Sequence, residues 1–173
     1  MDGIPLRFAD ADWKDVPEDI KKVVSNLVGT RRGAYLFGQI GCGKTHIAYA
    51  IKKHFEAEYH IPVWVINTTW LLHSLRLDFD RRPIDREWID DKIMKSKGLI
   101  IFDDIGVEKV TDWVAEAMYL MINERYEAMK PMIFTSNLSL DELSTKIGDR
   151  VPSRIAGMCD IIEIKGTDRR TVS

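Results

Sequence analysis

Apolar residues along the chain form short continuous runs that alternate with longer stretches in which they recur at helical spacing. The run at 99–102 is apolar throughout, which is typical of a strand buried on both faces of a sheet. Strands are predicted at residues 34–37, 62–66, 99–102, 132–135 and 161–164. Helices are predicted from about Pro17 to Gly29, and at residues 44–58, 68–97 with a break at Arg82-Pro83, 111–129, 140–147 and 151–156. This alternation predicts an α/β domain whose five-stranded, mainly parallel sheet is flanked by helices.

Composition then narrows the class of protein. The chain has 173 residues, 45% apolar and 30% charged, which suits one globular domain with a full core. Its 25 basic and 27 acidic residues exclude a globally basic protein of the histone type and leave room for a local basic patch. No apolar run approaches the length of a membrane span, and residues 1–12 lack a secretory signal pattern. Two cysteines, Cys42 and Cys159, imply no disulfide framework, so we expect a cytoplasmic protein without a membrane partner.

The turn between the first predicted strand and the helix at 44–58 carries the pattern G-x-x-x-x-G-K-T. Glycines let several backbone N–H groups converge on one anion, and the helix N-terminus adds partial positive charge. Lys44 is expected to reach the β- and γ-phosphates, and Thr45 to offer its hydroxyl to Mg²⁺. A nucleoside triphosphate is therefore predicted to bind at Gly38, Gly41, Cys42, Gly43, Lys44, Thr45 and His46.

Cys42 inside this loop has two interpretations. A helix N-terminus lowers the pKa of a thiol, which would make Cys42 sensitive to oxidation. The alternative, which we favour, is that Cys42 fills an unconstrained position of the motif. The four histidines show no metal-ligand spacing, so Mg²⁺ is the one metal that we expect.

Two acids, Asp103 and Asp104, follow the buried run at 99–102. A buried carboxylate without a partner is costly, and Mg²⁺ beside a phosphate site would supply one. We assign Asp103 to the metal shell and Asp104 to polarising or orienting the attacking water. The alternative is a surface turn in which the two acids cap the next element.

Further motifs follow in an order that resembles a known family. After the phosphate loop and the acid pair come Thr135-Ser136-Asn137 and Gly148-Asp149-Arg150-Val-Pro-Ser-Arg154, with smaller features at residues 4–8, 105–106 and 122–126. The set resembles the AAA+ ATPases of the bacterial DnaC/DnaI helicase-loader and IstB transposition-helper group, over essentially the whole chain. The resemblance implies a P-loop NTPase fold of AAA+ type with a reduced or absent lid, and ATP and Mg²⁺ as ligands.

The resemblance also implies roles for single residues. Lys44 and Thr45 would form the Walker A pair, and Asp103 and Asp104 the Walker B pair, with aspartate at 104 where many AAA+ proteins have glutamate. Asn137 would be the sensor 1 residue that holds the attacking water. The alternative is that Asn137 caps the helix that follows.

Several arginines match the family's contacts between subunits. Arg154 matches the arginine finger, which acts on nucleotide bound to a neighbouring subunit and so implies a homo-oligomer. Arg150 is a second residue for this interface, and Arg169 or Arg170 would be the sensor 2 arginine. The alternative for Arg154 is a local ion pair with Asp149 or Asp160.

Residues 68–97 correspond to the segment that touches single-stranded DNA in the resembling loaders. Seven basic and six acidic side chains make no basic stripe by count, so binding would need Arg76, Arg81 and Arg82 on one face. Phe79 or Trp70 would stack on bases, although the spacing favours a core position for Trp70.

These observations lead to one hypothesis and its alternatives. Residues 1–173 are expected to be a single AAA+ ATPase domain without the loaders' N-terminal helicase-binding domain. The domain would hydrolyse ATP, assemble on single-stranded DNA and load or remodel a replicative helicase. The alternatives are an IstB-like helper of a transposase, a P-loop kinase of small molecules, and a nucleotide switch without motor work.

Overall fold

The computed structural model of the chain describes residues 3–78, 91, 93, 95–106 and 111–166. Within these residues a five-stranded sheet has the order β2-β3-β4-β1-β5, and each neighbouring pair is parallel. The predicted α/β fold with a parallel sheet is confirmed. The strands are β1 (Gly33–Phe37), β2 (Val63–Asn67), β3 (Leu99–Asp103), β4 (Met132–Ser136) and β5 (Cys159–Glu163).

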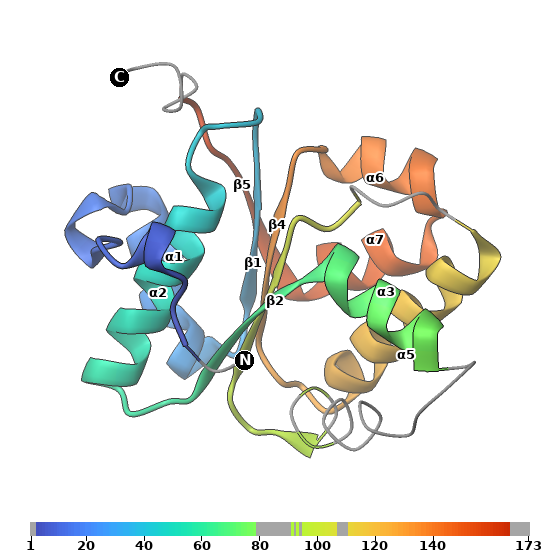
Figure 1. The fold of residues 1–173 in the computed structure, drawn as a ribbon, viewed down its shortest axis with the longest axis horizontal. Helices are drawn as coiled ribbons and strands as arrows, with labels where there is room; N and C mark the ends of the chain where they lie inside the picture. Colours follow the sequence, from blue (N-terminus) through green and yellow to red (C-terminus); the bar gives the residue numbers. More distant parts are fainter. Residues whose placement is uncertain (1–2, 79–90, 92, 94, 107–110, 167–173) are drawn as a thin grey trace.

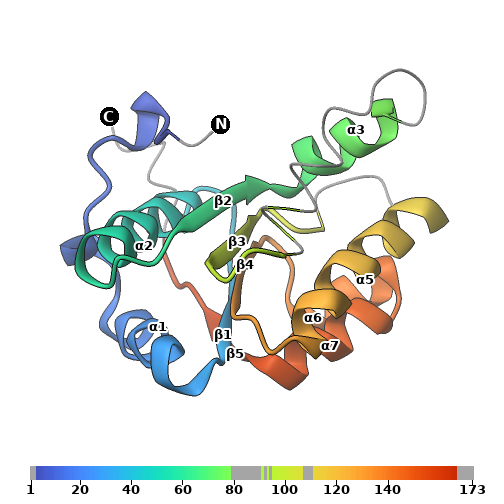
Figure 2. The same ribbon diagram turned by 90° about the horizontal axis from the view of Figure 1, so that it is seen from below.

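Helices cover both faces of the sheet, as Figures 1 and 2 show. One face carries α1 (Glu18–Thr30) and α2 (Lys44–Glu58), preceded by the short 3-10 helices η1 (Leu6–Phe8) and η2 (Trp13–Asp15). The other face carries α3 (Thr68–Asp78), α5 (Asp112–Glu127), α6 (Leu140–Ile147) and α7 (Arg150–Met158). No helix in the described ranges is long and apolar enough to cross a bilayer.

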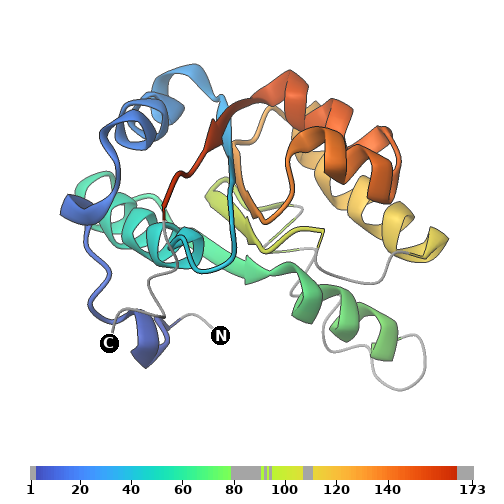
Figure 3. The same ribbon diagram turned by 90° about the horizontal axis from the view of Figure 1, so that it is seen from above.

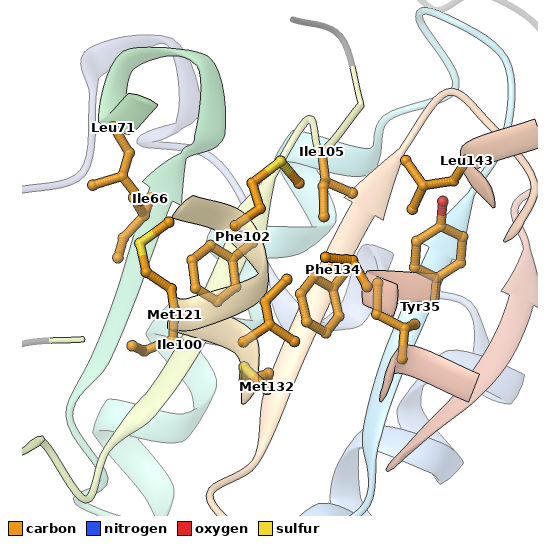
Figure 4. Close-up of a cluster of buried hydrophobic side chains, with 14 of the residues drawn as sticks. Tyr35, Ile66, Leu71, Ile100, Phe102, Ile105, Met121, Met132, Phe134 and Leu143 are labelled. Carbon is orange, nitrogen blue, oxygen red and sulfur yellow. The ribbon is translucent and has the colours of Figure 1, made fainter. Parts of the chain in front are cut away.

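The core on the α5 side is built around stacked aromatic rings (Figure 4). Phe102 of β3 and Phe134 of β4 lie with ring centroids 5.5 Å apart and planes 12° from parallel. Tyr35 of β1 is also fully buried, and its hydroxyl donates a 2.8 Å hydrogen bond to the Leu138 carbonyl. Burial raises the pKa of Tyr35 to about 12, so the phenol stays neutral and keeps this donor.

α1 and α2 lie together on the other face of the sheet (Figure 3), and a second cluster of buried apolar side chains packs between them and the strands. Ile20, Val24 and Leu27 recur at helical spacing along α1 and are buried, as the sequence predicts. The predicted stop at Gly29 is wrong: α1 runs to Thr30 and ends at Arg31, which has the left-handed φ of 58°. A hydrogen bond from the Arg31 amide to the Leu27 carbonyl closes the helix there.

The last strand begins two residues before its predicted start. The apolar run at 161–164 indicated the strand, yet β5 begins at Cys159, which is buried, while Ile161 is 43% exposed. Among the described strands β5 pairs with β1 alone, which makes it an edge of the sheet. An edge strand has a less continuous burial pattern, so apolar run length misjudges where it begins.

Trp70 is not a core residue, contrary to the sequence prediction. It is 41% exposed, whereas Leu71 and Leu72 are buried and Leu75 packs against the same cluster. The reason is where the helix starts. Because α3 begins at Thr68, the adjacent pair Leu71 and Leu72 faces the sheet and turns Trp70 toward solvent.

α5 buries an arginine that sequence patterning does not predict. The side chain of Arg125 is fully buried and donates four hydrogen bonds to carbonyls. Its acceptors are the carbonyl oxygens of Ile93 at 2.9 Å, Ser96 at 3.3 Å, Gly98 at 2.8 Å and Pro131 at 3.1 Å. Burial lowers the pKa of Arg125 to about 10, so the guanidinium remains charged at neutral pH. Arg125 thus links the segment that precedes β3 to the residue that precedes β4.

Candidate functional site

The strand order places the carboxyl ends of β3, β4 and β1 side by side. The phosphate loop follows β1, the acid pair follows β3, and Asn137 follows β4. A 3.2 Å hydrogen bond from the Gly38 amide to the Ser136 carbonyl links the start of the loop to the end of β4. The sheet therefore brings motifs about a hundred residues apart together at the carboxyl ends of its strands, which is where open parallel sheets bind ligands.

Two glycines of the loop are required by the backbone. A Cβ at Gly38 would lie 2.4 Å from the Ile164 carbonyl oxygen, so no side chain fits there. Gly43 has φ of 98° and is the residue before α2. The Lys44 ammonium donates to the carbonyls of Gly38 at 2.8 Å and Gln39 at 2.9 Å, and the side chain is buried. The loop thus wraps around the lysine predicted to meet phosphate.

Asp103 is buried and is held by two hydroxyl groups. Thr45 donates to Oδ2 at 3.1 Å, and Thr135 donates to Oδ1 at 2.6 Å. Burial raises the pKa of Asp103, and the hydrogen bond from Thr135 opposes that rise. The sequence correctly places Thr45 and Asp103 together. Sequence reasoning assigned no role to Thr135, although Thr135 opens the Thr-Ser-Asn motif.

The donor set fits Mg²⁺. Mg²⁺ is usually bound by one or two carboxylates together with substrate phosphates and waters. Thr45 and Asp103 supply one hydroxyl and one buried carboxylate beside the phosphate loop. Within the described ranges no group of three or more histidine, cysteine, aspartate or glutamate side chains is placed to hold a metal. A site that depends on phosphate oxygens for its remaining ligands agrees with both observations.

Asp104 adopts an uncommon backbone conformation. Its φ is 59°, in the left-handed region that residues other than glycine seldom occupy. Its amide donates a 2.9 Å hydrogen bond to the Thr135 hydroxyl, the same hydroxyl that donates to Asp103. Thr135 therefore fixes both acids, and the turn between them is held open at a cost in backbone strain.

Asn137 lies half-buried directly after β4. The alternative role of helix cap belongs to Ser139 instead. Ser139 accepts from the Glu142 amide, and the Glu142 side chain accepts from the Ser139 amide, so together they form a capping box. The role of Asn137 as a water-holding residue stays a prediction.

Arg154 of α7 is held by side chains of α5. Its Nε donates to Oδ1 of Asn123 at 3.0 Å, and its Nη2 donates to the Tyr119 hydroxyl at 3.1 Å. The predicted alternative partners are wrong for this arginine. Asp160 pairs with Arg32 at 3.1 Å, and Asp149 accepts a hydrogen bond from Ser144. Sequence reasoning missed Tyr119 and Asn123, whose spacing of four residues puts them on one helix face.

The remaining predicted residues lie as follows. His46 is near η2, with its Nε2 3.9 Å from Oδ2 of Asp15. Cys42 is buried in the loop, with its sulfur 3.7 Å from the Lys44 ammonium. Arg150 lies over the Tyr119 ring at 4.9 Å. Four of the predicted arginines lie outside the described residues, namely Arg81, Arg82, Arg169 and Arg170. Arg76 belongs to α3, but its side chain is not described.

Comparison with known proteins agrees with this arrangement. The chain is 29% identical over 140 residues to the phage-like element PBSX protein XkdC of Bacillus subtilis (strain 168), covering 76% of this chain and 50% of that protein. It is 29% identical over 119 residues to the replicative helicase loader DnaI of the same organism, covering 68% of this chain and 37% of DnaI. The chain thus spans about half or less of the length of these relatives.

Solved structures show the same fold. The crystal structure of the DnaC helicase loader superposes with a TM-score of 0.81 at 24% identity, over 93% of this chain and 100% of that one. The fold is therefore that of the P-loop AAA+ proteins. The sequence model described as "IstB-like ATP binding protein" matches residues 7–172. The chain belongs to the IstB-like ATP-binding protein family.

Proposed function

We propose that residues 1–173 form a single AAA+ domain that hydrolyses ATP in a Mg²⁺-dependent manner. The observation that carries this proposal is the junction of Thr45, Asp103 and Thr135 beside the phosphate loop. A hydroxyl and a buried carboxylate held in contact next to a phosphate-binding lysine are the parts that Mg-nucleotide hydrolysis needs.

The chemistry assigned to each residue follows from where it lies. Water attacks the γ-phosphorus, the bond to the bridging oxygen breaks, and ADP and phosphate leave. Mg²⁺, when bound, supplies positive charge to the phosphate oxygens. Lys44 neutralises charge on the phosphates, Asp104 orients the water and accepts its proton, and Asn137 holds that water in line. Arg154 of one subunit meets the nucleotide of its neighbour.

We further propose that the domain assembles on single-stranded DNA in the cytoplasm and loads or remodels a replicative helicase. Two observations support this. The relatives include a replicative helicase loader, and the fold is that of the loader AAA+ domain. Arg154 is half-buried on the face opposite to α2, so a neighbouring subunit can reach it.

The test combines two measurements on the same protein. Steady-state ATP hydrolysis is measured with and without single-stranded DNA, with K44A as the control that removes the phosphate contact. Fluorescence anisotropy of a labelled strand is measured with no nucleotide, with ADP and with a non-hydrolysable ATP analogue, at two salt concentrations. We expect DNA to stimulate hydrolysis, and we expect tight, cooperative binding only with the analogue. Absence of DNA binding in every state would overturn the DNA-assembled motor and favour a small-molecule kinase or a protein-only switch.

An IstB-like helper of a transposase is the second function, and the family match favours it. The ATPase core is shared, so the two functions differ in their partner. Duplex DNA should stimulate ATP hydrolysis by a transposition helper at least as well as single-stranded DNA does. A helicase loader should prefer the single strand, and its hydrolysis should respond to a purified replicative helicase.

A further inference from the structure

We propose that Tyr119 and Asn123 are positioning residues that hold Arg154 ready for the nucleotide of a neighbouring subunit. This inference rests on the proposed function, in which Arg154 acts in trans. Asn123 accepts from Nε of Arg154 at 3.0 Å, and the Tyr119 hydroxyl accepts from Nη2 at 3.1 Å. The two contacts bind adjacent nitrogens along one edge of the guanidinium, so they fix both its position and the direction of its plane.

Two aromatic rings complete the cradle. The Arg154 guanidinium lies 5.3 Å from the centroid of the Tyr119 ring and 5.5 Å from that of Tyr126. The faces of the rings stabilise the cation without neutralising it.

The positive charge of Arg154 is not compensated by the side chains that hold it. A carboxylate that accepts two hydrogen bonds from a guanidinium also compensates its positive charge. Arg32 shows that pattern here, with Nε and Nη2 both donating to Asp160. Arg154 is instead held by an amide, a phenol and two rings, and its hydrogen bonds within the described residues include none to a carboxylate. Its full positive charge is therefore available to an anion.

Arg150 strengthens this argument. It lies one helical turn before Arg154 on α7, and its guanidinium sits 4.9 Å from the same Tyr119 ring. Two like charges at this spacing repel each other on an isolated helix. Their juxtaposition around one ring becomes favourable when a polyanion such as a triphosphate approaches. Arg150 and Arg154 are the basic residues of α7, so an anion that approaches this helix meets both.

The cradle also reduces the entropy cost of binding phosphate. A guanidinium has five N–H groups, and two of those of Arg154 are engaged with α5. The others remain for phosphate oxygens. Because the side chain is already held in one orientation, it gives up less rotamer freedom when it meets the phosphate. Removing the cradle should therefore weaken the action of Arg154 without changing ATP binding at the subunit's own loop.

The test compares variants of the full chain with wild type. Y119F removes the phenol oxygen and keeps the ring, and N123A removes the amide. Y126F is the matched control, since the ring of Tyr126 contacts Arg154 while the hydrogen bonds of that arginine go to the other two side chains. N123D offers Arg154 a carboxylate, which should capture the arginine and neutralise it. Each variant is measured for kcat and KM of DNA-stimulated ATP hydrolysis and for thermal unfolding.

We expect the Y119F/N123A double variant to lower kcat about tenfold with little change in KM for ATP, since a small misplacement of a reacting group is costly. N123D should lower kcat as well, and Y126F should match wild type. Mixing Y119F/N123A with K44A should restore hydrolysis above the sum of the separate proteins. In mixed assemblies the intact Arg154 of a K44A subunit faces the intact phosphate loop of its neighbour.

Two outcomes overturn different claims. If R154A leaves kcat unchanged, the trans action of Arg154 in the proposed function is wrong and the cradle has no role. If R154A lowers kcat about a thousandfold or more, as removal of an arginine finger should, while Y119F/N123A and N123D match wild type, the finger stands and the cradle is wrong. A defect in Y119F/N123A without recovery on mixing with K44A would also contradict the cradle, because that defect would then lie in the subunit's own site.

Discussion

The Thr135 hydroxyl donates a 2.6 Å hydrogen bond to Oδ1 of Asp103 while it accepts one at 2.9 Å from the Asp104 amide. One side chain of β4 thus fixes both acids that follow the apolar run of β3. The hydroxyl has a single proton, which it gives to Asp103, and one of its lone pairs accepts the amide hydrogen of Asp104. The geometry of the proposed hydrolytic centre therefore depends on a residue that touches neither nucleotide nor water in the proposed mechanism.

Replacing Thr135 with valine keeps the shape of the side chain and removes both hydrogen bonds. We expect T135V to lower kcat about tenfold or more, because Asp103 and Asp104 lose their common anchor. T135S keeps the hydroxyl and should retain most of the activity. Steady-state hydrolysis at saturating ATP distinguishes the two variants. Equal rates for T135V and wild type would show that the acids are positioned by other groups.

Asp103 gives a pH-dependent stability in the absence of nucleotide and Mg²⁺. Burial raises its pKa in the folded state above the ordinary 3.8, so the folded protein binds this proton more readily than the unfolded chain. The resulting stabilisation is complete below 3.8 and is lost as the pH rises through the raised pKa. D103N does not titrate and should exceed wild type in Tm at pH 7, with a smaller difference at pH 4. Thermal unfolding across this range tests it, and a constant difference would contradict the raised pKa.

Arg125 should contribute strongly to stability. Its replacement by methionine keeps much of the volume and leaves four carbonyls without their donor, in two hydrogen bonds that are buried and two that are part-buried. We expect R125M to lower the free energy of unfolding by about 3 kcal/mol or more. R125K retains the charge but reaches fewer carbonyls, so its effect should be smaller. Urea denaturation measures both, with R32Q as an exposed control. A change below about 0.5 kcal/mol in R125M would show that water replaces the guanidinium.

Lys44 should couple nucleotide binding to stability. Mg-ATP at a hundred times its Kd should stabilise wild type by about 2.7 kcal/mol. K44A removes the ammonium that lies within the phosphate loop, so the same concentration should raise its Tm little. Differential scanning fluorimetry with and without Mg-ATP makes the comparison. Equal shifts in both proteins would place the nucleotide away from this loop.

Arg76, Arg81 and Arg82 are predicted from the sequence to contact single-stranded DNA. Substituting all three with glutamine should weaken binding and flatten the salt dependence by about 0.7 in slope for each phosphate that the protein no longer neutralises. K22Q is a suitable control, because Lys22 is exposed on α1, which covers the opposite face from α3. Anisotropy titrations at several salt concentrations give the slopes. An unchanged slope in the triple variant would remove this segment from the DNA interface.

Local patterns in the sequence predicted the elements that carry the nucleotide motifs. The predicted helices at 44–58 and 140–147 match α2 and α6 in both bounds, because the local sequence marks where each helix begins and ends. Thr45 and Asp103 were paired correctly because the phosphate-loop pattern and a strand ending in acids each have a fixed place in a parallel sheet.

The interactions that sequence reasoning missed depend on side chains from different elements. Arg125 lies on the buried face of α5, where a charged residue contradicts the apolar pattern, and its acceptors are backbone groups that the sequence does not mark. Tyr119 and Asn123 meet Arg154 only because α5 packs against α7. The prediction of Trp70 as a core residue fails because apolar spacing alone does not tell which of several consecutive apolar positions faces the sheet.

The separation of α2 from α5 and α7 by the sheet has a consequence for the kinetics of assembly. In the proposed mechanism each chain presents its phosphate loop to one neighbour and its arginine to the other, so subunits assemble head to tail. An open array then always has one fewer complete site than it has chains. Turnover per chain should accordingly rise with array length and level off. The rate per chain would then depend on protein concentration and on DNA length, whereas the turnover number of an ordinary enzyme does not depend on the enzyme's own concentration.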